Sequence, residues 1–364
     1  MKILINALTL HQGGGKTILL NLIKNIQINE NDNYTILVDN REEYLLYNKN
    51  NIKIISLNKI FQKQFLLPLT FILIIPILIK MKSFDKIFNF SDAPIYTKVF
   101  QIFYFDWAFM VYPEEFIYRN FNHKEKFRIF IKKKVFLLGI KFINKLIVQT
   151  PVIKKRFTEQ IDRSKLPEIL VIPVGRPSFK VGEKYKLKNT SHFKLLCLTN
   201  YYKHKNLESL IDVAQIIKEK KLNITIFLTL SENNGDSIQF LNSIKTKGLS
   251  NIIINLGTVK YEDLYGLYKA VDASILPTLI ESYSSTYIES ISFKKPILTS
   301  DYDFTRYLCG NCALYFDPFS SQSIYNSIIM LKEKKIYNKL IDECNQISNR
   351  NYSWQVVTSN ILKQ

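Results

Sequence analysis

The chain has 364 residues, of which 47% are apolar and 22% charged. This composition is typical of a globular protein with room for two domains of about 100–200 residues each, and it excludes disordered, collagen-like and small disulfide-stabilised chains. Fifty basic against 31 acidic residues give a net charge of +19, which attracts nucleotides, phosphorylated substrates, nucleic acid or anionic lipid alike. Only eight basic residues are arginines, whose planar guanidinium nucleic-acid readers usually need, so we expect no nucleic-acid partner.

In chain order, short apolar runs rich in β-branched residues alternate with longer amphipathic segments, as in parallel α/β sheets. The expected strands of a first series are residues 2–8, 35–38, 52–56, 86–90, 101–105 and 145–149. A second series comprises residues 194–199, 223–228, 251–256, 273–276 and 296–299, with helical periods such as 207–218 and 261–270 between them. Residues 176–188 lack a period and contain turn formers and charges, so they are expected to link two domains.

The most apolar segment, residues 65–79, is shorter than the roughly 20 residues of a spanning helix and contains Pro68 and Pro76. It is either a buried helix of the first domain or a face that rests in a bilayer interface. Flanking lysines and the basic run 132–134 support the second interpretation. Neither interpretation predicts a transmembrane span.

One glycine-rich turn and one acidic pair resemble nucleotide-binding and metal-binding motifs but lack residues that those motifs require. The turn at Gly13–Thr17 has Leu10 where a phosphate-binding P-loop requires glycine, and Ile18 where a dinucleotide fingerprint requires its third glycine. What remains is a strand, a glycine-rich turn and a helix whose backbone can approach a ligand. The acidic pair Asp301 and Asp303 is interpreted as a solvated turn rather than a metal site.

The cysteines and the first residues bear on the compartment. Four cysteines in 364 residues, with no signal peptide at residues 1–4, indicate a reducing, cytoplasmic location. Cys309 and Cys312 have the spacing of a redox motif, but they precede an expected strand at 313–316 instead of opening a helix. We interpret both as ordinary residues of a turn.

The most informative stretch is residues 277–290. An expected strand ends at Pro277, a loop presents Glu281, and a helix is expected to start near Ser284, where hydroxyl residues suit an N-cap. The free amides of such a helix N-terminus suit a phosphate. Glu289 falls a little over one turn into the helix, where its carboxylate can accept two hydrogen bonds from a ribose diol.

This stretch resembles family 4 of the retaining glycosyltransferases, which have the GT-B fold. Glu281 and Glu289 match the E-x7-E motif of that family. Four further segments resemble parts of it: the phosphate-binding turn at 201–207, the turn beneath the nucleotide base at 256–259, and two runs after the motif at 293–301 and 311–318.

The resemblance implies an α/β architecture of two Rossmann-like parallel-sheet domains facing a cleft. Trp354, in a final helix, is similar to the segment that crosses back to the first domain. The predicted domains are an acceptor-side domain of residues 1–178 completed by 346–364, a linker of residues 179–191, and a donor-binding domain of residues 192–345.

The resemblance also implies sugar transfer with retention from a UDP- or GDP-linked donor. Lys205 would neutralise the diphosphate as the glycosidic bond breaks, Glu281 would hold the donor sugar, and Glu289 would hold the ribose. The other implied donor-binding residues are Ser284, Ser285, Thr286, Gly13, Gly14, Gly15, Asn200, Gly257, Thr258 and Val259. In this family the leaving phosphate is thought to help deprotonate the acceptor, so no metal, cofactor or enzyme nucleophile is expected.

The chain departs from the family pattern at several positions. Asn200 stands where family members often have an arginine, which removes a bidentate phosphate contact. Residues 284–286 replace a "GLP" run, and Tyr307 occupies a place where an acid is common. The histidine after the acceptor-side strand has no counterpart, and Asp106 is the candidate catalytic residue in its place.

The sequence therefore predicts a peripheral enzyme at the cytoplasmic membrane face that builds surface polysaccharide or glycolipid on a lipid-linked or glycan acceptor. One alternative is another GT-B nucleotide-sugar enzyme, such as an epimerase or phosphorylase. A second alternative is a non-catalytic GT-B protein that acts as a binding or scaffold module. Outside this context, Lys205, Glu281 and Glu289 would be ordinary surface charges.

Overall fold

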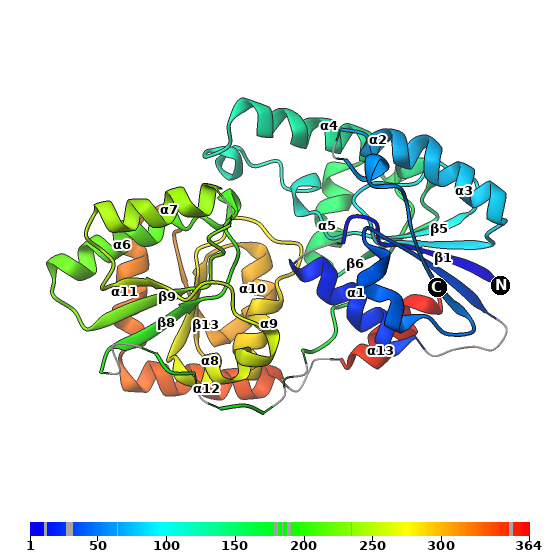
Figure 1. Cartoon of the computed structure of the whole chain (residues 1–364). Coiled ribbons are helices and arrows are strands. Elements are labelled where there is room, and N and C mark those ends of the chain that lie inside the picture. The colour runs from blue at the N-terminus through cyan, green and yellow to red at the C-terminus, as the bar shows by residue number, and fades with distance from the viewer. Residues whose placement is uncertain are drawn as a thin grey trace. The chain divides into compact units, whose positions relative to one another are not determined.

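A computed structural model describes every residue except 11–12, 27–31, 64, 178, 180, 184, 188–190, 234 and 349–351. The chain forms two compact units (Figure 1). The first contains residues 1–114, 121–175 and 352–364, and the second contains residues 115–120 and 176–351. The boundary thus follows residue 175 rather than 178, and α13 (Trp354–Leu362) belongs to the first unit.

The first unit is built on a parallel sheet. Among its described residues the strand order is β3-β2-β1-β4-β5-β6-β7, and every pairing is parallel. The strands are β1 (Lys2–Asn6), β2 (Asn33–Val38), β3 (Ile52–Ser56), β4 (Lys86–Asn89), β5 (Phe100–Tyr104), β6 (Lys145–Val148) and β7 (Glu168–Val171). Sequence analysis missed β7, a four-residue edge strand in which only Ile169 is buried.

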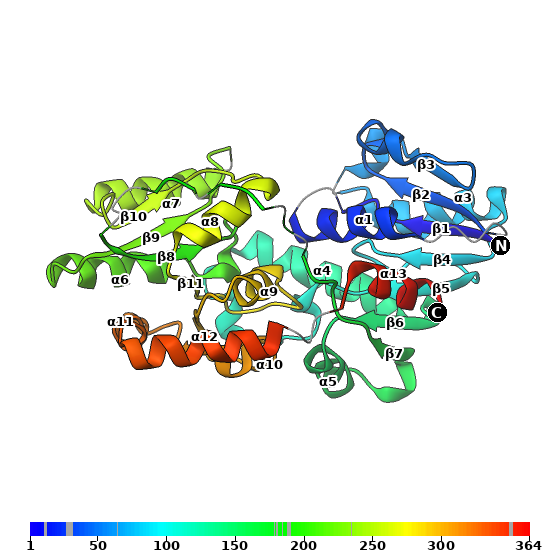
Figure 2. The ribbon, with the colours of Figure 1, turned by 90° about the horizontal axis from the view of Figure 1, so that it is seen from below.

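Helices cover both faces of this sheet (Figures 1 and 2). On one face α1 (Gly13–Asn25) packs with α13, and on the other lie α2 (Leu67–Leu69), α3 (Ile75–Lys82) and α4 (His123–Gly139). A further helix, α5 (Pro151–Gln160), follows β6.

The apolar segment predicted at 65–79 is helical and only half buried. A π-helical segment, Thr70–Ile74, joins α2 to α3. One side, with Phe71, Ile75 and Ile79, packs into the core of the first unit, whereas the other side is exposed. Among the described residues, no helix is both long and apolar enough to cross a bilayer.

Three buried amide side chains join the central strands of the first unit. The amide of Asn6 donates to Asn89 at 2.9 Å, and that of Asn89 donates to Gln101 at 2.9 Å. The amide of Gln101 in turn donates to the backbone oxygens of Ile95 and Phe142, at 3.0 and 2.9 Å. These bonds satisfy polar groups that would otherwise be costly to bury.

The second unit contains another parallel sheet. Its described residues give the strand order β10-β9-β8-β11-β12-β13, again with parallel pairing throughout. The strands are β8 (Phe193–Cys197), β9 (Ile224–Leu228), β10 (Ile253–Asn255), β11 (Ala273–Leu276), β12 (Ile297–Ser300) and β13 (Ala313–Phe316). The helices are α6 (Glu208–Glu219), α7 (Gly235–Thr246), α8 (Leu264–Ala270), α9 (Ser285–Ser292), α10 (Asp303–Cys309), α11 (Ser321–Leu331) and α12 (Lys334–Ser348).

The segment predicted as a linker, residues 179–191, packs on the second unit where the structure describes it. Phe179, Tyr185 and Leu187 pack against the core cluster around α8. The backbone N–H of Tyr185 donates to the carbonyl of Gly266 at 3.1 Å, and a Cβ at Gly266 would lie 2.0 Å from the carbonyl oxygen of Glu183. Turn formers and charges dominate the segment's composition and obscure these apolar anchors.

Candidate functional site

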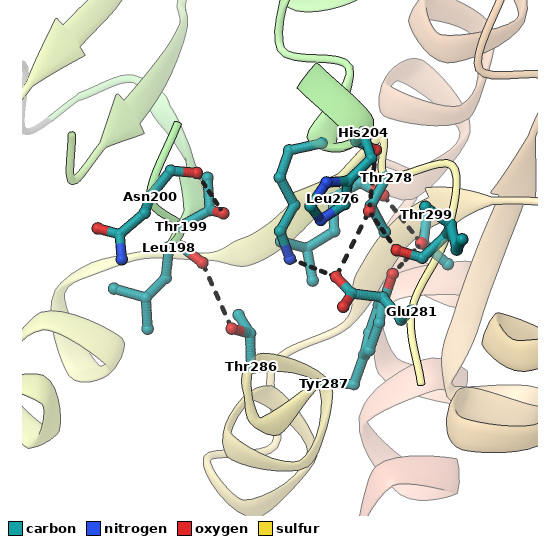
Figure 3. A network of polar contacts seen from close by, with 12 residues as sticks. Leu198, Thr199, Asn200, His204, Leu276, Thr278, Glu281, Thr286, Tyr287 and Thr299 are labelled. Atoms are coloured by element: carbon teal, nitrogen blue, oxygen red, sulfur yellow. Dashed lines mark hydrogen bonds and ion pairs between the residues drawn. The ribbon is translucent and has the colours of Figure 1, made fainter. Parts of the chain in front are cut away.

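A pocket in the second unit lies beyond the carboxyl ends of β8 and β11, at the N-terminal end of α9 (Figure 3). The chain adds β9 and β10 on one side of β8, then crosses to place β11 on the other side. Such a reversal opens a crevice in parallel sheets, where ligands bind. The pocket is lined by Cys197, Leu198, Thr199, Lys205, Leu207, Leu276, Pro277, Thr278, Glu281, Ser284, Thr286 and Tyr287.

Lys205 enters this pocket from a tight turn, Lys203–Lys205. The next residue, Asn206, closes the turn with a left-handed φ of 53°, which asparagine adopts more readily than most residues. Its buried side-chain amide donates to the carbonyl of Pro318 at 2.9 Å. The backbone that carries Lys205 is therefore fixed on its C-terminal side.

His204 anchors the same turn to the loop after β11. Its carbonyl oxygen accepts the backbone N–H of Leu279 at 2.8 Å and the hydroxyl of Thr278 at 3.3 Å. Its ring stacks on Tyr202 with a centroid distance of 5.5 Å. Burial, and secondarily the charge of Lys205, lowers the pKa of His204 to about 3, so the imidazole is neutral at physiological pH.

Lys205 and Glu281 both line the pocket and form an ion pair there; Glu281 is labelled in Figure 3. Their side chains are only 17% and 12% exposed. The hydroxyl of Thr278 also donates to the same oxygen of Glu281 at 3.4 Å. Because the pair is largely removed from water, an anionic ligand that reaches Lys205 competes with Glu281 rather than with solvent.

The N-terminus of α9 forms the third wall. Ser284 is the N-cap residue, as predicted, although its hydroxyl makes no capping hydrogen bond. The hydroxyl of Thr286 donates to the carbonyl of Leu198 at 3.3 Å and ties the helix to β8. The first amides of a helix have no intrahelical acceptors, so those at Ser284 to Thr286 suit an anion.

Glu289 lies one turn further into α9 and is almost completely buried, at 6% exposure. The hydroxyl of Tyr268, from α8, donates to its Oε2 at 3.1 Å. Burial raises the pKa of Glu289 to about 7, and hydrogen bonds from Tyr268 and Ser285 oppose that rise. Near neutral pH the carboxyl group is therefore present in both its neutral and its charged form. Further hydrogen-bond donors from a ligand would favour the charged form.

The predicted base-side turn, residues 257–259, packs through one residue against the cluster around α8. Gly257 has a left-handed φ of 73°, and a Cβ there would meet no atom within 4 Å. Thr258 is exposed, whereas Val259 packs against the cluster that contains Tyr268. The turn is thus linked through Val259 to the cluster whose Tyr268 bonds to Glu289.

Asn200 is exposed and does not line the pocket, whereas its neighbour Thr199 does. The hydroxyl of Thr199 donates to the carbonyl of Asn200 at 3.0 Å, and the Thr199 N–H donates to the Thr229 hydroxyl at 3.1 Å. Binding at Asn200 stays a prediction, and Thr199 is the polar group in contact with the pocket.

The three predicted glycines of the first unit lie inside a helix instead of a preceding turn. Gly13 begins α1, and Gly14 and Gly15 complete its first turn. A Cβ at Gly14 would meet no atom within 4 Å, so a ligand can approach this backbone closely. A Cβ at Gly15 would instead meet the side chain of Leu10 at 2.7 Å.

Asp106 follows β5 in the first unit and is partly buried. Desolvation and the charge of Asp92 raise its pKa to about 7, against the opposing effect of Lys132. Lys132 forms an ion pair with Asp92 at 3.0 Å and lies over the ring of Trp107 at 4.3 Å. A carboxyl group with this pKa can exchange a proton near neutral pH.

The acidic pair and the cysteine pair singled out in the sequence have the following surroundings. Asp301 forms a bidentate ion pair with Arg306, at 2.7 and 2.8 Å. Cys309 and Cys312 are buried at the end of α10. Within the described part of the chain, no three histidine, cysteine or acidic residues are grouped to hold a metal ion.

Sequence analysis missed four polar residues of the site. Thr199 and Thr278 stand at the ends of expected strands, which was a usable signal. Tyr268 and Tyr287 gave no such signal, because their apolar sequence neighbours indicate core residues. In the structure the hydroxyl of Tyr287 lies 2.9 Å from that of Thr299.

Sequence comparison relates this unit to known proteins. Residues 182–354 match the family model described as glycosyl transferases group 1. The chain is also 23% identical over 177 residues to mannosylfructose-phosphate synthase of Agrobacterium fabrum. That alignment covers 46% of this chain and 39% of the synthase, so it spans less than half of either protein.

Solved structures resemble the chain over nearly its whole length. Sucrose-phosphate synthase from Thermosynechococcus elongatus has a TM-score of 0.74 at 11% identity, over 100% of this chain and 98% of that one. HepE from Anabaena, solved in complex with UDP-glucose, has a TM-score of 0.70 at 16% identity, with 100% and 98% coverage. At these identities the likeness establishes the fold, which is GT-B.

Proposed function

We propose that the chain transfers a sugar, with retention, from a nucleotide-sugar donor, because residues 182–354 match the glycosyl transferases group 1 model and the chain has the GT-B fold. The observation that carries the proposal is the Lys205–Glu281 pair, set at the N-terminus of α9 between β8 and β11. A cation and a helix N-terminus together form a site for a diphosphate.

In this proposal the diphosphate displaces Glu281 from Lys205. The ammonium group and the first amides of α9 then face the phosphate oxygens, and Glu281 is released to accept hydrogen bonds from sugar hydroxyls. Glu289 receives the ribose hydroxyls in its ionised form. Val259 and its turn lie beside the nucleotide base.

Transfer breaks the bond between the anomeric carbon and the phosphate oxygen and forms a bond to the acceptor oxygen. Negative charge develops on the leaving diphosphate, where Lys205 stabilises it more strongly than in the ground state. The acceptor proton passes to a phosphate oxygen on the same face of the sugar. Since Lys205 and the α9 amides supply the positive charge, we propose that the reaction needs no metal ion.

The donor is UDP- or GDP-linked in this proposal, and the UDP-glucose complex of the similar HepE fold supports testing UDP first. The acceptor is a lipid-linked or glycan chain of surface polysaccharide or glycolipid synthesis, reached by a peripheral protein at the cytoplasmic membrane face. The net charge of +19 supports an anionic partner of this kind. Asp106 is the candidate catalytic residue on the acceptor side.

The test is a thermal-shift screen of the protein with UDP, GDP, ADP and their sugar conjugates, repeated with Lys205→Ala and Glu289→Ala. Selective binding to the native state raises the melting temperature. One nucleotide class should stabilise the wild type, and both substitutions should abolish the shift. No shift with any nucleotide, in a folded protein, would leave a binding or scaffold role.

A further inference from the structure

The helical stretch from α2 to α3 exposes a row of large apolar side chains. They recur about every four residues, which places them on one side of the helix. The row comprises Leu69, Leu73, Ile77 and Met81, which are between 43% and 79% exposed, and Phe65, in the turn before α2, is 75% exposed. The opposite side is packed in the core of the first unit, so the exposed row is not needed for folding.

A second row lies on α4. Its members are Phe127, Phe130, Ile131, Leu137 and Leu138, which are between 39% and 65% exposed. The buried side of α4 includes Phe136, and Val135 packs against the same core cluster as Phe71. α4 therefore covers the same face of the sheet as α3 (Figure 1).

Tyr96 links the two helical segments directly. Its hydroxyl donates to the carbonyl of Val135 at 3.3 Å, and its backbone N–H donates to the carbonyl of Phe71 at 3.3 Å. Both rows belong to helices packed on one side of one sheet, so their exposed side chains point away from it together. We call these two rows and their flanking basic residues the α3/α4 face.

The charges of the α3/α4 face have one sign. Residues 59–82 contain four lysines and no acidic residue, and residues 123–141 contain seven basic residues and one acid, Glu125. That acid accepts the Asn122 N–H in the capping box of α4. The exposed basic residues are Lys59, Lys63, Lys80, Lys82, Lys124, Lys126, Arg128, Lys134 and Lys141.

We propose that the α3/α4 face docks on a bilayer surface that contains anionic lipids. Its apolar rows would enter the boundary between headgroups and acyl chains, while the lysines extend their stems and keep their charges at the headgroups. Lysine is depleted from protein–protein interfaces, which favours lipid over a protein partner. This inference depends on the proposed function in one respect only, namely that the acceptor lies in the same membrane.

The experiment measures flotation of the full chain with vesicles of phosphatidylcholine, with or without about 30% phosphatidylglycerol, in about 0.1 M salt. No nucleotide is added, so failure of the donor-site proposal would not affect the result. The wild type should float with the anionic vesicles, and raising the salt to about 0.5 M should weaken binding several-fold.

Two variants separate the contributions. Leu69→Gln/Leu73→Gln/Ile77→Gln and Lys80→Gln/Lys82→Gln/Lys134→Gln should each lower the vesicle partition coefficient about tenfold. The matched control is Ile238→Gln/Met330→Gln/Val356→Gln, which replaces apolar side chains of similar exposure outside the face and should bind as the wild type does. All variants should keep the wild-type melting temperature.

Three results would overturn the proposal. The first is equal flotation with neutral and anionic vesicles, and the second is anionic binding that neither variant reduces. The third is self-association that the Gln variants abolish, seen by sedimentation velocity without vesicle binding, which would assign the face to a second copy of the chain.

Discussion

The sheets of the two units have the same kind of strand order but carry different polar side chains at the point where that order reverses. In each sheet the first strand has later strands on both sides, which places a reversal at β1/β4 and at β8/β11. At β1/β4 the buried amides of Asn6 and Asn89 bond to each other. At β8/β11 a charged pair, Lys205 and Glu281, faces a pocket.

We interpret the amides at β1/β4 as structural groups and the charged pair at β8/β11 as groups that face a ligand. The neutral amides of the first unit are satisfied within the chain, so removing one costs stability. The pair in the second unit is charged, is next to a helix N-terminus and can exchange partners. The following substitutions test whether this distinction holds.

The largest effect is expected for Lys205→Ala. Loss of the charge that faces the leaving diphosphate should lower the transfer rate at least about 100-fold, because that charge acts mainly in the transition state. The measurement is the rate of release of the nucleoside diphosphate with a saturating donor. Lys335→Ala removes an exposed lysine of α12 as the control, and equal loss in both variants would reduce the role of Lys205 to general surface charge.

Asn89→Leu should lower the free energy of unfolding by about 3 kcal/mol, since Asn6, Gln101 and nearby backbone groups lose their partner. Urea denaturation measures this effect. UDP-glucose affinity should not change in the folded variant. Asn21→Leu, which removes an exposed hydrogen bond on α1, should change stability far less.

Glu289 should make stability and donor binding depend on pH in opposite directions. Its pKa is about 7 in the folded chain against 4.5 for an ordinary glutamate, so the folded state holds the proton more tightly. The free energy of unfolding should therefore fall by about 3 kcal/mol as the pH rises from about 4.5 to about 7. If Glu289 holds the ribose as proposed, affinity for UDP-glucose should rise through about pH 7, because the ribose hydroxyls would donate to the carboxylate.

Glu289→Gln should remove both dependences and weaken UDP-glucose binding about tenfold at pH 8. Calorimetric titrations over pH, with denaturation in the same buffers, give the two profiles. The exposed Glu262→Gln is the control. A wild-type-like affinity profile in Glu289→Gln would contradict the ribose assignment.

The smallest effect is expected for Tyr268→Phe. Its hydroxyl lowers the pKa of Glu289, so its loss should move the midpoint of the affinity profile to higher pH and reduce affinity at pH 7 by about two- to threefold. Tyr261→Phe is the exposed control. A shift of the midpoint to lower pH would show that the hydroxyl competes with the ribose instead.

The sequence predicted the sheets well because buried parallel strands are continuous apolar runs. Ile224–Leu228 is buried throughout, and such a run is readable without its neighbours. β7 was missed because an edge strand buries little. The packing of Tyr185 and Leu187 on the second unit was not predicted, because they are isolated apolar residues among charges and only tertiary contact with the cluster around α8 shows that they are anchored.

Site residues could be predicted from the sequence where polar or charged side chains come shortly after the end of an expected strand. Lys205, Glu281 and Ser284 were predicted and line one pocket. Tyr268 could not be found, since its hydroxyl meets Glu289 only through packing of α8 against α9. Glu289 itself was predicted, but its burial and raised pKa depend on that packing.

The close contact at Gly266 has a practical consequence for dissecting the protein. The backbone of Glu183 and Tyr185 fills the space that any larger residue at 266 would need. A gene fragment starting at residue 192 would strip this backbone away and leave the apolar surface of α8 to aggregate. A fragment starting at residue 176 keeps that cover, so it is the better one to express when the pocket of the second unit is studied alone.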